Sequence, residues 1–141
     1  MKRGHYGCPR GAVIGLALVL VLALAPSARA AHGGGPGVAS TEPDYLKWLI
    51  ESRQPVVVID LRPAAEYRAG HLPGALSVPM AELDRRFAEI PTTPMVVLYC
   101  RCSVEEAATA YAFLETRGYG NHVVLQEGFD GWTRRRFPLV K

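Results

Sequence analysis

Three short apolar runs alternate with helical segments along this chain, and this alternation limits the possible folds more than any other feature. The runs are residues 56–60 (VVVID), 95–99 (MVVLY) and 122–126 (HVVLQ). Continuous β-branched runs of this length are typical of strands that are buried on both faces, as in parallel sheets. The pattern therefore predicts a three-layer α/β fold with a central, mainly parallel sheet and helices on both faces.

Between these runs, residues that commonly begin or end helices mark the positions of the expected helices. Thr41 is expected to begin the first helix, because Asp44 follows at capping distance and Pro43 suits a first turn. A short strand is expected at residues 76–78. Further helices are predicted from Pro63 to Ala69, from Ala81 to Ile90, from Ser103 to the stop at Gly118, and from Gly128 to Arg135.

The first 30 residues have the pattern of an export signal. Basic residues precede an unbroken apolar run at positions 11–25, and Ala28-Arg29-Ala30 has the small-x-small pattern of a signal-peptidase site. We expect cleavage after Ala30 or Ala31; the alternative is a retained membrane anchor, although about 20 apolar residues are usually needed to span a bilayer. The domain organisation expected is a signal peptide at 1–30, a Gly-rich linker at 31–40 and one domain at 41–141.

The net positive charge of the chain comes from this signal. Residues 1–30 hold four of the 16 basic residues and none of the 13 acidic ones, which leaves 12 basic and 13 acidic residues and a net charge of −1. The remaining basic run, Arg134 to Arg136, is typical of a solvated helix face. The balance therefore gives no indication of nucleic-acid binding.

Two cysteines, Cys100 and Cys102, lie outside the signal segment, and Cys8 lies within it. A bridge between Cys100 and Cys102 would close almost no loop and would stabilise the fold little. Their spacing therefore indicates chemistry rather than a structural crosslink.

Cys100 is placed between a buried strand and the start of a helix. Ser103 and Glu106 form an S-x-x-E capping box, so unpaired N–H groups of the helix start face Cys100. Such groups favour an anion and lower a thiol pKa, and the thiolate is the nucleophile. They can also hold a persulfide, with no metal or cofactor required. The alternative is an inert buried cysteine.

Three motifs in order resemble those of the rhodanese family. They are residues 58–75 (VIDLRPAAEYRAGHLPGA), residues 96–100 (VVLYC) and residues 124–132 (VLQEGFDGW). The resemblance extends from about Thr41 to Val140. It implies a rhodanese-like fold and a sulfurtransferase in which Cys100 takes up a sulfane sulfur and passes it to a thiol or to cyanide.

The resemblance also assigns roles beyond Cys100. Asp60 and Arg62 match the family pair near the active loop and are expected to organise the pocket; the alternative is an ion pair that only ties loops together. His71 is expected to be part of a structural turn. Phe129 and Trp132 are expected to lie in the core and the pocket wall.

The active loop departs from the usual family pattern of Cys-x-x-Gly-x-Arg. The active-loop residues here are Cys100, Arg101, Cys102, Ser103, Val104 and Glu105. Glu105 and Glu106 oppose an anionic donor such as thiosulfate, which Arg101 offsets in part. A protein persulfide or a small-thiol persulfide is the donor expected instead. Ala107 stands where related phosphatases carry an arginine, which argues against phosphate or arsenate chemistry.

Cys102 has two interpretations: a thiol that resolves the Cys100 persulfide or forms a disulfide with Cys100, or simply a small loop residue.

The sequence thus predicts an exported sulfurtransferase of the bacterial envelope, monomeric, acting between a sulfur donor and a thiol acceptor. Contact with a membrane is expected only if the signal is retained. Two alternatives stay open: a thiol–disulfide redox protein using Cys100 and Cys102, and a non-catalytic binding module of the same fold.

Overall fold

The computed structural model describes residues 37–141, so the predicted signal peptide and most of the predicted linker lie outside the described residues. Five strands form one sheet in the order β1-β5-β4-β2-β3, and every pairing is parallel. The strands are β1 (Ser40–Thr41), β2 (Val56–Asp60), β3 (Leu76–Ser77), β4 (Met95–Tyr99) and β5 (His122–Leu125). The α/β fold with a parallel sheet is confirmed.

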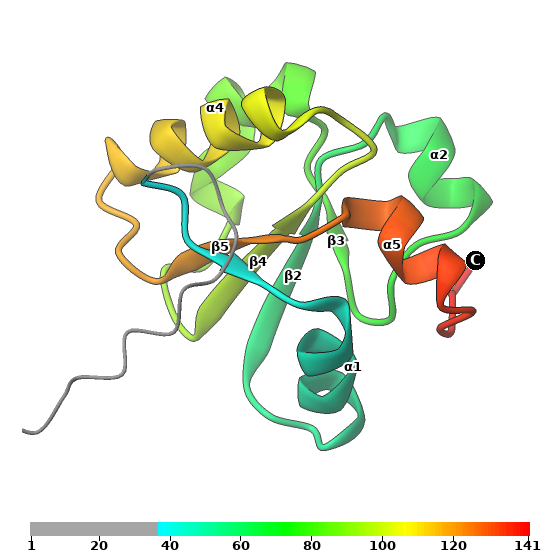
Figure 1. Ribbon diagram of the computed structural model, residues 1–141. Coiled ribbons are helices and arrows are strands. Elements are labelled where there is room, and N and C mark those ends of the chain that lie inside the picture. The colour runs from blue at the N-terminus through cyan, green and yellow to red at the C-terminus, as the bar shows by residue number, and fades with distance from the viewer. Residues whose placement is uncertain (1–36) are drawn as a thin grey trace, which may run out of the picture. The chain divides into compact units, whose positions relative to one another are not determined.

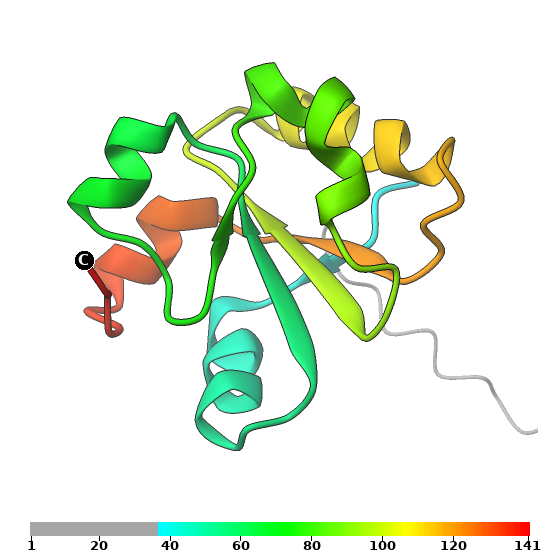
Figure 2. The same cartoon turned by 180° about the vertical axis from the view of Figure 1, so that it is seen from behind.

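Helices cover both faces of the sheet, which gives the three layers predicted (Figure 1). One face carries α4 (Val104–Glu115) together with three short turns, η1 (Met80–Glu82), α3 (Leu83–Arg86) and η2 (Phe87–Glu89). The opposite face carries α1 (Pro43–Glu51) and α5 (Gly128–Arg134), and α2 (Ala64–Ala69) lies near α5, as the view from behind also shows (Figure 2).

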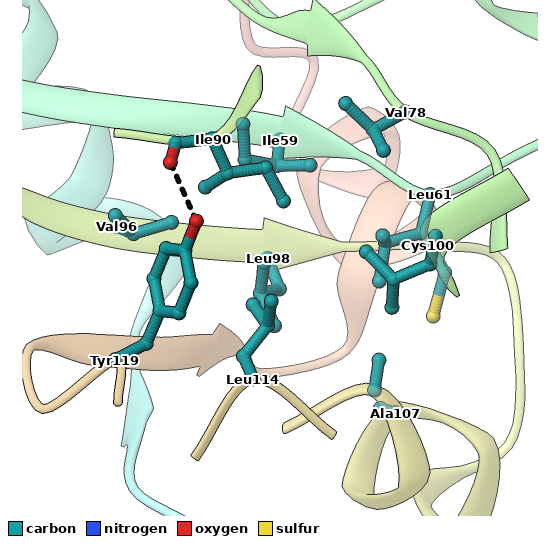
Figure 3. Packing of buried hydrophobic residues seen from close by; sticks show 12 residues of the cluster. Ile59, Leu61, Val78, Ile90, Val96, Leu98, Cys100, Ala107, Leu114 and Tyr119 are labelled. Atoms are coloured by element: carbon teal, nitrogen blue, oxygen red, sulfur yellow. Dashed lines mark hydrogen bonds between the residues drawn. The ribbon is translucent and has the colours of Figure 1, made fainter. Parts of the chain in front are cut away.

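The central strands divide their side chains between two hydrophobic clusters, because successive strand residues point to opposite faces. Ile59 and Leu98 face α4, in a cluster that also contains Leu114 and Cys100 (Figure 3). The other cluster packs against α1 and α5 and contains Val58, Val97, Tyr99, Phe129 and Trp132. The two strands that carry candidate site residues, β2 and β4, are thus held rigidly at the centre of the molecule.

The start of the domain differs from the sequence-based expectation. Thr41 does not cap a helix; it lies in β1 and pairs with Leu125 of β5. The helix begins two residues later, at Pro43, because a residue before proline disfavours the helical conformation and Glu42 is extended (ψ 146°). β1, at the edge of the sheet, therefore begins at the position where the sequence predicts the end of the linker.

The helix predicted from Ala81 to Ile90 is broken into three short turns. The backbone of Glu82 (φ −115°, ψ −2°) and of Arg86 (φ −113°, ψ 1°) departs from α-helical values.

Within residues 37–141, no helix combines the length and the apolar character that crossing a membrane requires.

Candidate active site

Cys100 lies at the carboxyl edge of the sheet, directly after β4, where parallel α/β sheets place their ligands. Its side chain is 7% exposed and packs at the end of the cluster near Leu61 and Ala107 (Figure 3). The carbonyl oxygen of Cys100 accepts a hydrogen bond of 2.9 Å from the N–H of Phe129. The start of α5 thereby fixes the backbone of the candidate nucleophile.

The capping box predicted at the start of α4 is present. The Glu106 N–H donates to the Ser103 hydroxyl at 3.2 Å, and the Ser103 N–H donates to the Glu106 carboxylate at 2.9 Å. Hydrogen bonds from its own backbone N–H and from Ser103 lower the pKa of the exposed Glu105. The same cap that starts the helix therefore holds carboxylates beside the cysteine loop.

Cys100 and Cys102 are joined by a disulfide bond, with their Cα atoms 5.4 Å apart. Cys100 is buried, whereas Cys102 is exposed on the loop before Ser103. The loop therefore brings the two sulfur atoms into direct reach of each other.

Two adjacent hollows open at this edge, and Arg62, Glu66 and Arg101 line both. The first has a volume of about 180 Å³ and is lined also by Leu61, Pro63, Met80, Cys100, Cys102 and Glu106. The second, of about 230 Å³, is lined also by Ala69, Gly70, Phe129 and Leu139. The first hollow can receive a small sulfur compound next to both sulfur atoms.

Asp60 and Arg62 form a buried ion pair at the end of β2. Their side chains are 0% and 2% exposed, and the Arg62 Nε donates to Asp60 at 2.9 Å. Burial alone would lower the pKa of Arg62, but the hydrogen bond and the charge of Asp60 outweigh burial and raise it. The Arg62 Nη2 also donates to the Gly70 carbonyl at 2.8 Å. The pair thus ties loops together, and only Arg62 of the two lines the hollows.

Tyr99 links this pair to the active strand. Its hydroxyl donates to the Asp60 carboxylate and accepts from the Leu72 N–H at 3.2 Å. Burial, followed by the hydrogen bond to Asp60, raises the pKa of Tyr99, so the hydroxyl stays protonated. Because Tyr99 immediately precedes Cys100, the ion pair anchors the strand that carries the candidate nucleophile.

The Arg101 side chain turns toward carboxylates of other segments. Its Nε donates to Asp130 at 2.8 Å, and its Nη1 lies 3.4 Å from Glu66. The guanidinium groups of Arg101 and Arg62 lie 4.9 Å and 3.6 Å from the centre of the Phe129 ring. Both arginines that line the hollows are therefore already paired with carboxylates.

His71, Trp132 and the basic run make contacts within the fold. His71 stacks on Tyr67 and pairs its backbone with Val140. The indole N–H of Trp132 donates to the Pro138 carbonyl at 2.8 Å. In the basic run, Arg135 pairs with Asp44 and Glu127, and Arg134 pairs with Glu127.

Sequence reasoning missed three residues around the site: Glu66, Met80 and Asp130. Glu66 stands within the first signature motif, so its position was available as a signal, but its partner Arg101 lies 35 residues away. Asp130 likewise stands within the last of the three motifs, whereas Met80 carried no local signal, and only the folded chain brings either residue to the loop. In the part of the chain that the structure describes, no group of three or more His, Cys, Asp or Glu side chains is placed to hold a metal ion.

Comparison with known sequences supports the predicted resemblance to the rhodanese family. The sequence matches the family described as Rhodanese-like domain over residues 42–135. It is 34% identical over 103 residues to a sulfurtransferase of Allochromatium vinosum, covering 73% of this chain and 95% of that protein. It is 42% identical over 110 residues to an HTH-type transcriptional regulator of Mycobacterium tuberculosis, covering 75% of this chain but only 46% of the regulator.

Solved structures share the fold. A rhodanese-related protein from Thermoplasma volcanium superposes with a TM-score of 0.64 at 22% identity, covering 72% of this chain and 97% of that one. A thiosulfate sulfurtransferase from Pseudomonas aeruginosa superposes with a TM-score of 0.62 at 28% identity, covering 73% of this chain and 20% of that one. On the sequence match, the fold and the position of Cys100, this chain belongs to the rhodanese-like domain family.

Proposed function

We propose that the protein is a sulfurtransferase in which Cys100 carries the sulfur as a persulfide. The observation that carries this proposal is the position of Cys100, at the end of a central strand, in a small hollow, and three residues before Ser103, the N-cap of α4. The reduced Cys100 thiolate attacks the sulfane sulfur of a donor; a new S–S bond forms, and the rest of the donor leaves as an anion. An acceptor thiolate then attacks the outer sulfur, and Cys100 departs as the thiolate.

The helix start supplies the main electrostatic support for this cycle. The dipole of α4 favours the thiolate and the persulfide anion over the neutral thiol, while the N–H groups of Glu105 and Glu106 are bonded to oxygen atoms of the cap. The buried Asp60–Arg62 pair and the Tyr99 hydroxyl hold the preceding strand in place. We assign Asp60 and Arg62 as positioning residues, with no covalent role.

The charges around the hollow favour a persulfide of a small thiol or of a protein over thiosulfate as donor. Arg62 is paired with Asp60, and Arg101 with Asp130 and Glu66. Glu106 adds a further carboxylate to the lining. A dianionic donor would therefore meet paired cations and an additional negative charge, whereas the reacting group of a persulfide carries a single negative charge.

A steady-state assay with two donors tests the proposal. The reduced protein is given glutathione persulfide or thiosulfate, with cyanide as acceptor, and thiocyanate is measured. We expect turnover with glutathione persulfide, a lower kcat/KM with thiosulfate, and no turnover above background in Cys100→Ser. Equal rates for the wild type and Cys100→Ser would contradict the proposal.

The Cys100–Cys102 disulfide favours a second candidate, a thiol–disulfide oxidoreductase. In that function the loop would exchange electrons with a substrate thiol and would need no sulfane sulfur. Its test is the reduction of a model protein disulfide by the reduced protein. Activity in the wild type that is lost in both Cys100→Ser and Cys102→Ser, without any sulfur uptake, would favour this function.

We also propose that the protein is exported to the bacterial envelope. The proposal rests on the charged start, the apolar run at 11–25 and the Ala28-Arg29-Ala30 pattern. Expression of the full chain in a bacterium, followed by fractionation and N-terminal sequencing, tests it. A mature N-terminus at residue 31 or 32 in the periplasmic fraction is expected, and an uncut chain in the cytoplasm would contradict export.

A further inference from the structure

We propose that Cys102 resolves the Cys100 persulfide and releases its sulfur as hydrosulfide, which gives the protein a second product besides the transferred sulfur. The inference rests on the proposed function, because it requires a persulfide on Cys100. It goes beyond sulfur transfer, because the sulfur leaves without an external acceptor.

The disulfide shows that the loop can bring the two sulfur atoms together. Cys102 is separated from Cys100 by one residue, and their Cα atoms are 5.4 Å apart. This separation is within the range usual for disulfides. Both cysteines line the hollow in which the persulfide would form. A reduced Cys102 therefore lies next to the S–S bond of the Cys100 persulfide, which must break.

The step balances without an added oxidant. The Cys102 thiolate attacks the Sγ of persulfidated Cys100, the Cys100–Cys102 bond forms, and the outer sulfur leaves with the bonding electrons as hydrosulfide. The sulfane sulfur is reduced, and the two cysteine sulfurs are oxidised to the disulfide. Hydrosulfide is a good leaving group, because a leaving thiol of lower pKa departs faster.

Attack on the Cys100 Sγ, rather than on the outer sulfur, is the step that forms the bond seen in the structure. Attack on the outer sulfur would instead move the persulfide to Cys102 and would leave Cys100 as a free thiolate. The two routes therefore end in different covalent products, a disulfide in one and a Cys102 persulfide in the other.

The two cysteines differ in access, and this difference predicts how the loop is reset. Cys100 is 7% exposed and Cys102 is exposed, so a reducing thiol reaches the Cys102 sulfur first. That attack forms a mixed disulfide on Cys102 and frees the Cys100 thiolate in the hollow. A second thiol then releases Cys102, so each turnover converts two thiols to a disulfide and one sulfane sulfur to hydrosulfide.

A single-turnover experiment tests the inference. Fully reduced wild type and Cys102→Ser are each mixed with one equivalent of glutathione persulfide, without cyanide. Hydrosulfide is trapped with monobromobimane, and the protein is alkylated and examined by intact mass and peptide mapping. Cys102→Ser is the matched control, because serine keeps the size of the side chain but cannot form the bond. Released glutathione has a different target in each variant, the disulfide in the wild type and the persulfide in Cys102→Ser, so alkylation stops the reaction after one turnover.

The expected result is close to one hydrosulfide per wild-type chain together with a Cys100–Cys102 disulfide. Cys102→Ser should keep one added sulfur, about 32 Da, on Cys100, and cyanide should remove it. If the wild type keeps the persulfide as Cys102→Ser does, or carries it on Cys102, the inference is overturned while sulfur uptake stands. If neither protein takes up sulfur, the proposed function fails, and this inference fails with it.

Discussion

The carbonyl oxygen of Cys100 lies too close to Gly128 to leave room for the Cβ that any other residue would carry at position 128. Gly128 has a positive φ of 52°, and the next residue, Phe129, donates its N–H to the same carbonyl. The last signature motif of the chain is thus in direct contact with the backbone of the candidate nucleophile. A glycine is therefore needed at position 128 to leave room for the backbone of the active loop.

We predict that Gly128→Ala lowers both stability and sulfur transfer. The added Cβ would strain the backbone and push against Cys100, at a cost of about 1–3 kcal/mol in the free energy of unfolding. Persulfide formation should slow about tenfold or more, because the nucleophile is displaced. Gly120→Ala is the control, since no atom lies within 4 Å of its added Cβ. Denaturant unfolding and persulfide kinetics measure both effects; equal behaviour of the two variants would contradict the contact described.

The Asp60–Arg62 pair should be essential to the fold. Asp60→Asn leaves the Arg62 guanidinium buried without its charge partner, and breaking a buried pair in this way costs about 3–5 kcal/mol. Asp84→Asn, at an exposed carboxylate, is the control. Urea unfolding should show the large loss only in Asp60→Asn. A loss below about 1 kcal/mol would mean that the pair contributes little.

Removing a negative charge beside the cysteines should improve the use of thiosulfate. Glu106→Gln keeps the capping box, because glutamine also serves at that position. We expect kcat/KM for thiosulfate to rise about two- to fivefold, with little change for glutathione persulfide. Glu115→Gln, at the far end of α4, should change neither value. A uniform change for both donors would show that charge does not select the donor.

Acid should weaken the ion pairs that Glu127, before the start of α5, makes with Arg134 and Arg135 at the end of the same helix. Hydrogen bonds from Arg135 and Arg134 lower the pKa of this carboxyl from 4.5 to about 2. A lowered folded-state pKa means that the stabilisation is complete above about pH 4.5 and is lost as the pH falls toward 2. Glu127→Gln should therefore be less stable than the wild type at pH 7, and this difference should shrink with acid. A constant difference across that range would contradict the role of the carboxylate.

The fold was largely predictable from local patterns, and the surroundings of the site were not. β2 and β4 begin and end at the predicted residues, because continuous β-branched runs of that length suit a buried strand. The capping box at Ser103 was readable because both of its partners lie within four residues. β1 was missed because Ser40 and Thr41 have no strand pattern, and only pairing with β5 defines them. The contacts of Arg101 with Glu66 and Asp130 join segments 35 and 29 residues apart, which no local pattern encodes.

Peptide mapping of the Cys102→Ser variant after treatment with glutathione persulfide shows whether Cys100 carries the sulfur. With Cys102 absent, internal disulfide formation is excluded, so any sulfur taken up stays where it was bound. We predict one added sulfur on the peptide that contains Cys100, released by cyanide as thiocyanate, and none in Cys100→Ser. Absence of sulfur on Cys100, or equal uptake by Cys100→Ser, would contradict it.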